Sequence, residues 1–85
     1  MNISGVLVHA KPEQAAQVEQ QLTKIPGVEV HAVTENGRLV VTVEQDNDKM
    51  IADTVLTIHN CDGVLSAAMV YQYGDDDNDE QEGSI

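Results

Sequence analysis

The segment Gly63-Val-Leu-Ser-Ala-Ala-Met-Val-Tyr-Gln-Tyr73 is the strongest indication of the fold, because it repeats a pattern that begins at Ile25-Pro-Gly-Val-Glu-Val30. In each stretch a predicted helix stops at a glycine, and a valine follows at once to open a strand. The apolar helical positions of the first unit recur 36 residues later in the second, where Ala15, Leu22 and Ile25 are matched by Ile51, Ile58 and Cys61. Two helix-turn-strand units, each preceded by another strand, predict a β-α-β-β-α-β chain.

Two helices are predicted from the spacing of apolar residues. Pro12 and Glu13 suit the first turn of a helix whose buried stripe is Ala15, Val18, Leu22 and Ile25. The second helix has the stripe Ile51, Val55 and Ile58, and one of the residues 46–48 should accept a hydrogen bond from its unpaired N-terminal amides.

Four strands are expected at residues 3–10, 28–32, 39–44 and 64–73, and Asn36-Gly37 predicts a two-residue type I′ hairpin between the middle two. Right-handed crossovers then give an antiparallel sheet in the order 4-1-3-2 with both helices on one face. The predicted fold class is therefore α+β, a ferredoxin-like sandwich that leaves the other sheet face open.

Strand alternation predicts which residues occupy that open face, because choosing the helix-facing set fixes the rest. We expect the helices to cover Val6, Val8, Val28, Val30, Leu39, Val41, Val43, Ala67, Met69 and Tyr71. The open face then carries Gly5, Leu7, His9, His31, Val33, Val40, Thr42, Ser66, Ala68, Val70 and Gln72. In the last strand the polar residues Ser66 and Gln72 decide the assignment. This semi-apolar surface, with small residues at Gly5 and Ala68, suits a docked helix; the alternatives are an ordinary solvated face or a dimer contact.

Charge divides the chain into a folded domain at residues 1–73 and an acidic tail at residues 74–85, which we expect to be disordered. The six acidic residues of the tail account for six of the 11 net negative charges and leave −5 on the domain. Nucleic acid is a poor partner, since the four basic residues, Lys11, Lys24, Arg38 and Lys49, are scattered. A basic peptide fits the charge better.

The sequence predicts a cytoplasmic protein without enzymatic chemistry. No apolar run reaches the ~20 residues of a membrane span, and no signal segment opens the chain. The lone Cys61 fits a reducing compartment and a small apolar role in the core. No catalytic triad spacing, phosphate-binding glycine loop or paired cysteine motif occurs. His9 and His31 share the predicted open face, but no third ligand can be placed, so we expect no metal site and no cofactor.

Four segments together resemble the NapD family: Gly5-Val-Leu-Val-His-Ala-Lys-Pro-Glu13, Ile25-Pro-Gly-Val-Glu-Val30, Gly37-Arg-Leu-Val-Val-Thr-Val-Glu44 and Gly63-Val-Leu-Ser-Ala-Ala-Met-Val-Tyr71. The resemblance spans residue 3 to about residue 73. It implies a cytoplasmic chaperone that binds the twin-arginine signal peptide of the periplasmic nitrate reductase precursor. Such a chaperone delays export until the molybdenum cofactor is inserted and the subunit is folded, and it holds the peptide as a helix against the open sheet face.

The resemblance brings no binding motif, so the site residues come from strand alternation alone. We expect the apolar side of the peptide to dock on Leu7, Val40, Ala68 and Val70, and its arginines to meet the rim acids Glu29, Glu35 and Glu44. The protein is expected to be a monomer or a weak dimer. Two other classes share the topology and stay open: a ligand-sensing module similar to ACT or Lrp-type domains, and a dimerisation module. An acylphosphatase-like enzyme would need a basic phosphate-binding loop that the sequence does not show.

Overall fold

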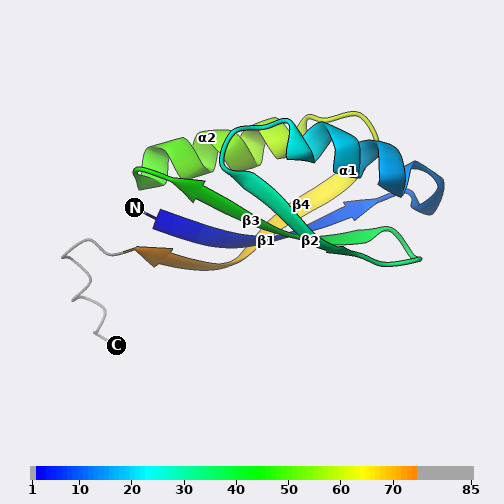
Figure 1. The fold of residues 1–85 in the computed structure, drawn as a ribbon, viewed down its shortest axis with the longest axis horizontal. Coiled ribbons are helices and arrows are strands. Elements are labelled where there is room, and N and C mark those ends of the chain that lie inside the picture. The colour runs from blue at the N-terminus through cyan, green and yellow to red at the C-terminus, as the bar shows by residue number, and fades with distance from the viewer. Residues whose placement is uncertain (1, 75–85) are drawn as a thin grey trace.

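The computed structural model of the 85-residue chain describes residues 2–74, so the predicted acidic tail beyond Gly74 lies outside the described residues. The elements follow the predicted order (Figure 1). They are β1 (Asn2–Ala10), the 3-10 turn η1 (Pro12–Gln14), α1 (Ala15–Thr23), β2 (Val28–Val33), β3 (Arg38–Gln45), α2 (Asp48–His59) and β4 (Val64–Gly74).

The four strands form one antiparallel sheet in the order β2-β3-β1-β4, which is the predicted order read from the other edge. Both helices lie on one face of it, with α1 over β2 and α2 over β4, β3 and β1 (Figure 1). The predicted α+β, ferredoxin-like sandwich is therefore confirmed. None of the helices within residues 2–74 is long and apolar enough to cross a membrane.

The two helix-turn-strand units match in their backbone geometry as well as in sequence. Gly27 and Gly63 adopt φ angles of 83° and 91°, a region that residues with a side chain seldom enter. The amide of the valine after each glycine donates to the carbonyl three residues back, at 3.1 Å for Val28 to Ile25 and 3.2 Å for Val64 to Cys61. Each glycine thus ends a helical segment and turns the chain directly into a strand.

Local capping explains where the helices begin. The side chain of Asn47 accepts a hydrogen bond from the amide of Met50 at 2.9 Å, so the predicted cap among residues 46–48 is Asn47. The predicted first helix opens as the 3-10 turn at Pro12, and its α-helical part starts at Ala15.

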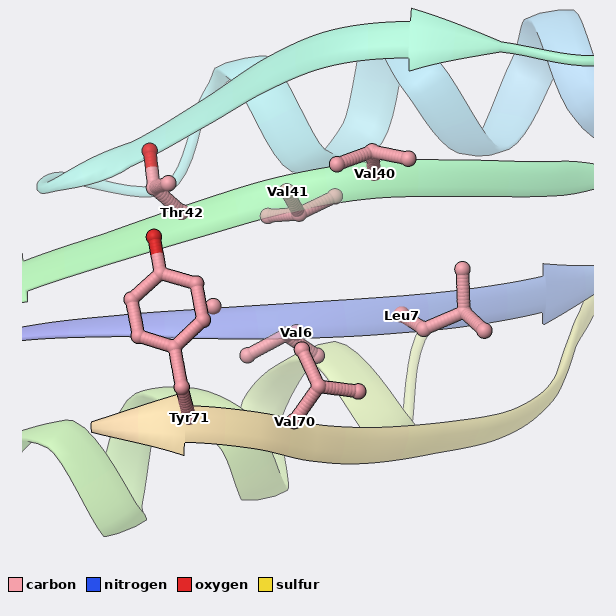
Figure 2. Close-up of a pocket in the computed structure, with 8 residues that line it drawn as sticks. Val6, Leu7, Val40, Val41, Thr42, Val70 and Tyr71 are labelled. Carbon is pink, nitrogen blue, oxygen red and sulfur yellow. The ribbon is translucent and has the colours of Figure 1, made fainter.

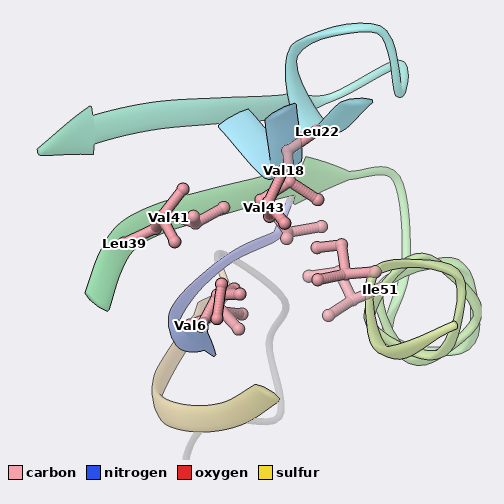
Figure 3. Close-up of a cluster of buried hydrophobic side chains, with 10 residues drawn as sticks. Val6, Val18, Leu22, Leu39, Val41, Val43 and Ile51 are labelled. Atoms are coloured by element: carbon pink, nitrogen blue, oxygen red, sulfur yellow. The ribbon is translucent and has the colours of Figure 1, made fainter. Parts of the chain in front are cut away.

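The core fills the space between the helices and one sheet face (Figure 3). Its sheet side includes the fully buried residues Val6, Val8, Leu39, Val41 and Val43, all of which were predicted to face the helices. The helix side supplies Val18, Leu22, Ile51 and Ile58. The opposite sheet face has no helix over it within the described residues 2–74.

The β2–β3 turn differs from the predicted type I′ hairpin. The amide of Thr34 donates to the carbonyl of Arg38 at 2.8 Å, and the amide of Gly37 donates to the carbonyl of Thr34 at 3.1 Å, which makes a three-residue loop. A type I′ turn needs positive φ at both central residues, whereas in this loop positive φ occurs only at Gly37, at 88°. The Thr34 hydroxyl stabilises the wider turn, because it accepts from the Arg38 amide at 3.1 Å.

Candidate functional site

The open face is the face of the sheet opposite the helices. Because residues paired across antiparallel strands share a face, the pairing register shows which residues lie on it. Three rows cross β3, β1 and β4 in turn. They are Arg38–His9–Ser66, Val40–Leu7–Ala68 and Thr42–Gly5–Tyr71. Glu29 extends the third row because it pairs with Thr42, and Glu44 pairs with Ile3 one row further on.

An apolar groove of about 180 Å³ lies in the middle of this face (Figure 2). Its lining residues are Gly5, Val6, Leu7, Val40, Val41, Thr42, Val70 and Tyr71, from the three strands β1, β3 and β4. Leu7, Val40 and Val70 are 36%, 46% and 61% exposed, although each is a large apolar residue. The fold therefore presents a continuous apolar surface to solvent, of the kind that marks a docking site.

The last strand contains a bulge that reverses the predicted alternation in its second half. Gly5 pairs with Tyr71 while Val6 pairs with Met69, so Val70 is an extra residue on β4. As a result Tyr71 lies on the open face, where it lines the groove beside Val70 (Figure 2). The prediction that Tyr71 faces the helices was wrong.

Gln72 shows the other consequence of the same bulge. It was predicted on the open face, but it pairs with Ser4, a fully buried residue of the helix-covered face. Its side-chain amide donates to the carboxylate of Asp48 at the start of α2, which places it on the helix side. The polar side chain of Gln72 thus contacts the start of α2, and the assignment of Gln72 to the site was wrong.

A second bulge, on β2, moves Val33 away from the predicted site. Ala32 pairs with Val40 and Val33 pairs with Leu39, so Val33 shares the side of Leu39 and Ala32 takes the predicted place on the open face. His31 stays on the open face, because its Nε2 lies 2.7 Å from Oγ1 of Thr42.

The predicted rim acids do not lie together. Glu29 and Glu44 are exposed and lie toward the same end of the open face. The carboxylate of Glu29 is 3.9 Å from Nε2 of His31. Glu35 lies in the β2–β3 turn, at the end where Arg38 pairs with His9. Two of the three acids therefore lie toward one end of the open face, and the third lies at the opposite end.

The histidines and the cysteine show no geometry of a metal site. His9 lies in the row of Arg38, two rows away from Thr42, which contacts His31. Across residues 2–74 no group of three or more His, Cys, Asp or Glu residues is arranged to hold a metal ion. Partial burial raises the pKa of the Cys61 thiol, and the nearby carboxylate of Asp62 raises it further. Cys61 packs against the core, the role predicted for it.

Comparisons with known proteins show the family of the chain. A family model described as NapD protein matches residues 1–76. Chaperone NapD of Escherichia coli (strain K12) is 31% identical over 80 residues, which cover 92% of this chain and 91% of the relative. Chaperone NapD of Paracoccus pantotrophus is 32% identical over 72 residues, which cover 85% of this chain and 63% of the relative.

A solved structure, described as the solution structure of the E. coli Tat proofreading chaperone protein NapD, superposes with a TM-score of 0.78 at 28% identity. The match covers 89% of this chain and 80% of that chain. These relatives are named chaperones, a role that is not enzymatic, as the sequence predicted. The chain belongs to the NapD family.

Proposed function

We propose that the open face binds the twin-arginine signal peptide of a periplasmic nitrate reductase precursor, and that binding holds back export until cofactor insertion and folding are complete. The observation that carries this proposal is the apolar groove on the open face, with Leu7, Val40 and Val70 exposed around it. The name of the related structure, a Tat proofreading chaperone, supports the same role.

The groove suits an amphipathic helix better than a small polar ligand. Its lining is almost entirely apolar, and Ala68 beside Leu7 leaves room for a helix to approach. Burying ~600 Å² of apolar surface would contribute about 15 kcal/mol before the costs of association. Ordering the peptide and restricting its motion offset most of that gain, so dissociation constants between micromolar and nanomolar are expected.

The charge of the protein favours a basic partner. The chain carries a net charge of −11, and Glu29 and Glu44 stand exposed on the binding face itself. Opposite charge speeds encounter and disfavours wrong partners, so the basic start of the peptide contributes selectivity while the groove contributes most of the affinity.

Regulation by competition follows from this mode of binding. A signal peptide that lies on the sheet of a chaperone is hidden from the export machinery, and no conformational switch is needed. The complex must form before the precursor leaves the cytoplasm, so we place the protein there.

Calorimetric titration with a synthetic signal peptide from the nitrate reductase of the same organism tests the proposal. A peptide with both arginines replaced by lysine and an unrelated twin-arginine peptide are the controls. We expect micromolar or tighter binding of the first peptide and weaker binding of both controls. Absence of heat, together with absence of competition at high peptide concentration, would exclude the proposal.

The exposed groove favours one rival function, which is pairing of two chains through their open faces. Sedimentation analysis over a wide concentration range separates the two. A constant monomer mass supports peptide binding. A dimer that dissociates on Val40→Glu, without loss of fold, would support the rival function.

A further inference from the structure

The chemistry of the open face is ordered along the strands. At one end lie the acids Glu29 and Glu44, and at the other end lies Arg38, in the row of His9 and Ser66. The apolar groove occupies the rows between these ends. The binding face is therefore asymmetric in charge, and a docked segment with a charged end has one favoured direction.

Tyr71 marks the boundary between the acidic end and the groove. Its ring lies over Gly5, and its hydroxyl points toward Thr42, the partner of Glu29 (Figure 2). An exposed aromatic ring in the same row of the sheet as a carboxylate can stack on a guanidinium, while the carboxylate accepts hydrogen bonds from that guanidinium. Further along the strands, Leu7, Val40 and Val70 continue the surface as purely apolar side chains.

We propose that the open face binds its peptide in one direction, with the arginine-bearing N-terminal end over Glu29, Glu44 and Tyr71 and the apolar turns running through the groove toward Arg38. The proposal rests on the proposed function and adds the orientation and the arginine subsite. It matches the order of the ligand, in which a basic start precedes an apolar stretch. The helix dipole favours the same direction, since it places the positive N-terminus beside acids and the negative C-terminus beside Arg38.

The dimensions of the face are consistent with this orientation. From Ile3, the partner of Glu44, to His9, the partner of Arg38, β1 advances six residues, or about 20 Å at ~3.3 Å per residue. A helix of about 13 residues spans that length at 1.5 Å per residue. One short amphipathic helix thus reaches from the acidic end to the Arg38 end.

Other charged residues modify the asymmetry without reversing it. Glu35 lies in the β2–β3 turn at the Arg38 end, outside the paired rows. Gly74 pairs with Asn2 at the acidic end, and the six acids of the tail follow it directly in the sequence. The acidic end is therefore the end from which the negatively charged tail starts.

Paramagnetic relaxation measurements test the direction. The ¹⁵N-labelled protein is mixed with the signal peptide carrying a nitroxide at its N-terminus or, in a second sample, at its C-terminus. We expect the N-terminal label to broaden the amides of Ile3 and Glu44, and the C-terminal label to broaden those of His9, Arg38 and Ser66. The reversed pattern, or equal broadening of both ends by either label, would overturn the direction and leave the proposed function intact. Absence of binding would overturn both.

Two variants with the same change in net charge test the subsite. Glu44→Gln removes an acid from the proposed arginine subsite, and Glu35→Gln removes one from the opposite end. We expect Glu44→Gln to weaken binding about fivefold at low salt and to reduce the dependence on salt, while Glu35→Gln changes affinity by less than about twofold. Equal effects of the two variants, or a larger effect of Glu35→Gln, would contradict the subsite.

Discussion

The ring of Tyr71 occupies the space that a side chain on Gly5 would need. A Cβ built on Gly5 overlaps three atoms of this ring, and the two residues are direct partners between β1 and β4. The glycine of a central strand is therefore covered by the aromatic residue of its neighbour, a pairing known to compensate glycine in sheets. The surface of the open face at this point is an aromatic ring rather than bare backbone.

Gly5→Ala is expected to displace the Tyr71 ring from its position. Because Tyr71 is 53% exposed, the ring can swing outward, so the melting temperature should change little. Peptide affinity should fall several-fold, because the aromatic surface next to the groove is lost. Titration calorimetry and the ring-proton shifts of Tyr71 measure the two effects.

A double-mutant cycle provides the control for this prediction. In the Tyr71→Ala background the added methyl group of Gly5→Ala meets no ring, so it should have no further effect on affinity. A full additional loss in that background would mean that Gly5 acts through direct contact of its backbone with the peptide.

Substitutions on neighbouring residues of β3 should separate binding from folding. Val40→Glu, and likewise Leu7→Glu on β1, place a charge in the groove and should abolish binding, with melting behaviour close to wild type. Leu39→Glu, one residue from Val40, buries a charge in the core and should unfold the domain. Circular dichroism and calorimetry check both outcomes. Unfolding by Val40→Glu would show that this face is covered in the native protein.

The two helix-ending glycines should differ in how well they tolerate alanine. A Cβ at Gly27 would overlap the backbone carbonyl of Glu44, which cannot move without disturbing β3. A Cβ at Gly63 would lie 2.9 Å from Oε1 of Gln14 and 3.0 Å from Cγ2 of Val18, which are side-chain atoms. Both positions have positive φ and should lose about 1–3 kcal/mol.

Urea unfolding of the two variants should therefore give the larger loss for Gly27→Ala, with an unchanged slope against urea concentration. A larger loss of stability in Gly63→Ala than in Gly27→Ala would contradict this prediction. It would mean that the side chains of Gln14 and Val18 cannot move aside for the added methyl group.

Loss of the α2 cap should reduce stability without affecting the site. Asn47→Ala removes the acceptor for the Met50 amide and should lower the free energy of unfolding by about 1 kcal/mol. Asn47→Asp or Asn47→Ser keeps an acceptor and should restore most of the loss. Peptide affinity should be equal in all three variants, because Asn47 is not part of the groove. A change in affinity would link α2 to the binding face.

Deletion of residues 75–85 should leave the fold intact and slow the association with a basic peptide. The deletion removes six acids next to the end of β4, so we expect a smaller association rate at low salt and almost no change at high salt. Stopped-flow fluorescence with a labelled peptide measures both. Unchanged rates at low salt would assign the tail to solubility alone.

The architecture followed from sequence because each helix end carries its own local signal. Gly27 and Gly63 end the two helical segments, Asn47 caps one helix, and the apolar stripes fix which helix faces enter the core. These signals act within a few residues, so a single sequence contains them.

The open face was predicted only in part, because two of the three register shifts in the sheet, one on β4 opposite Gly5 and Val6 and one on β2, reverse the predicted alternation. Each bulge adds one residue to an edge strand, which moved Val33 and Gln72 to the other side and brought Tyr71 onto the site. In these apolar strands no particular residue type marks the position of a bulge. The one signal in the sequence was Gly5 on the neighbouring strand, because a glycine within a strand is often covered by an aromatic residue of the paired strand.

Chemical-shift mapping of the ¹⁵N-labelled protein during titration with its signal peptide tests most directly whether the open face is the binding site. We expect the largest changes at the amides of Leu7, Val40, Ala68, Val70 and Tyr71, with small changes along α1 and α2. Changes concentrated on the helices, with the groove residues unaffected, would contradict binding at the open face.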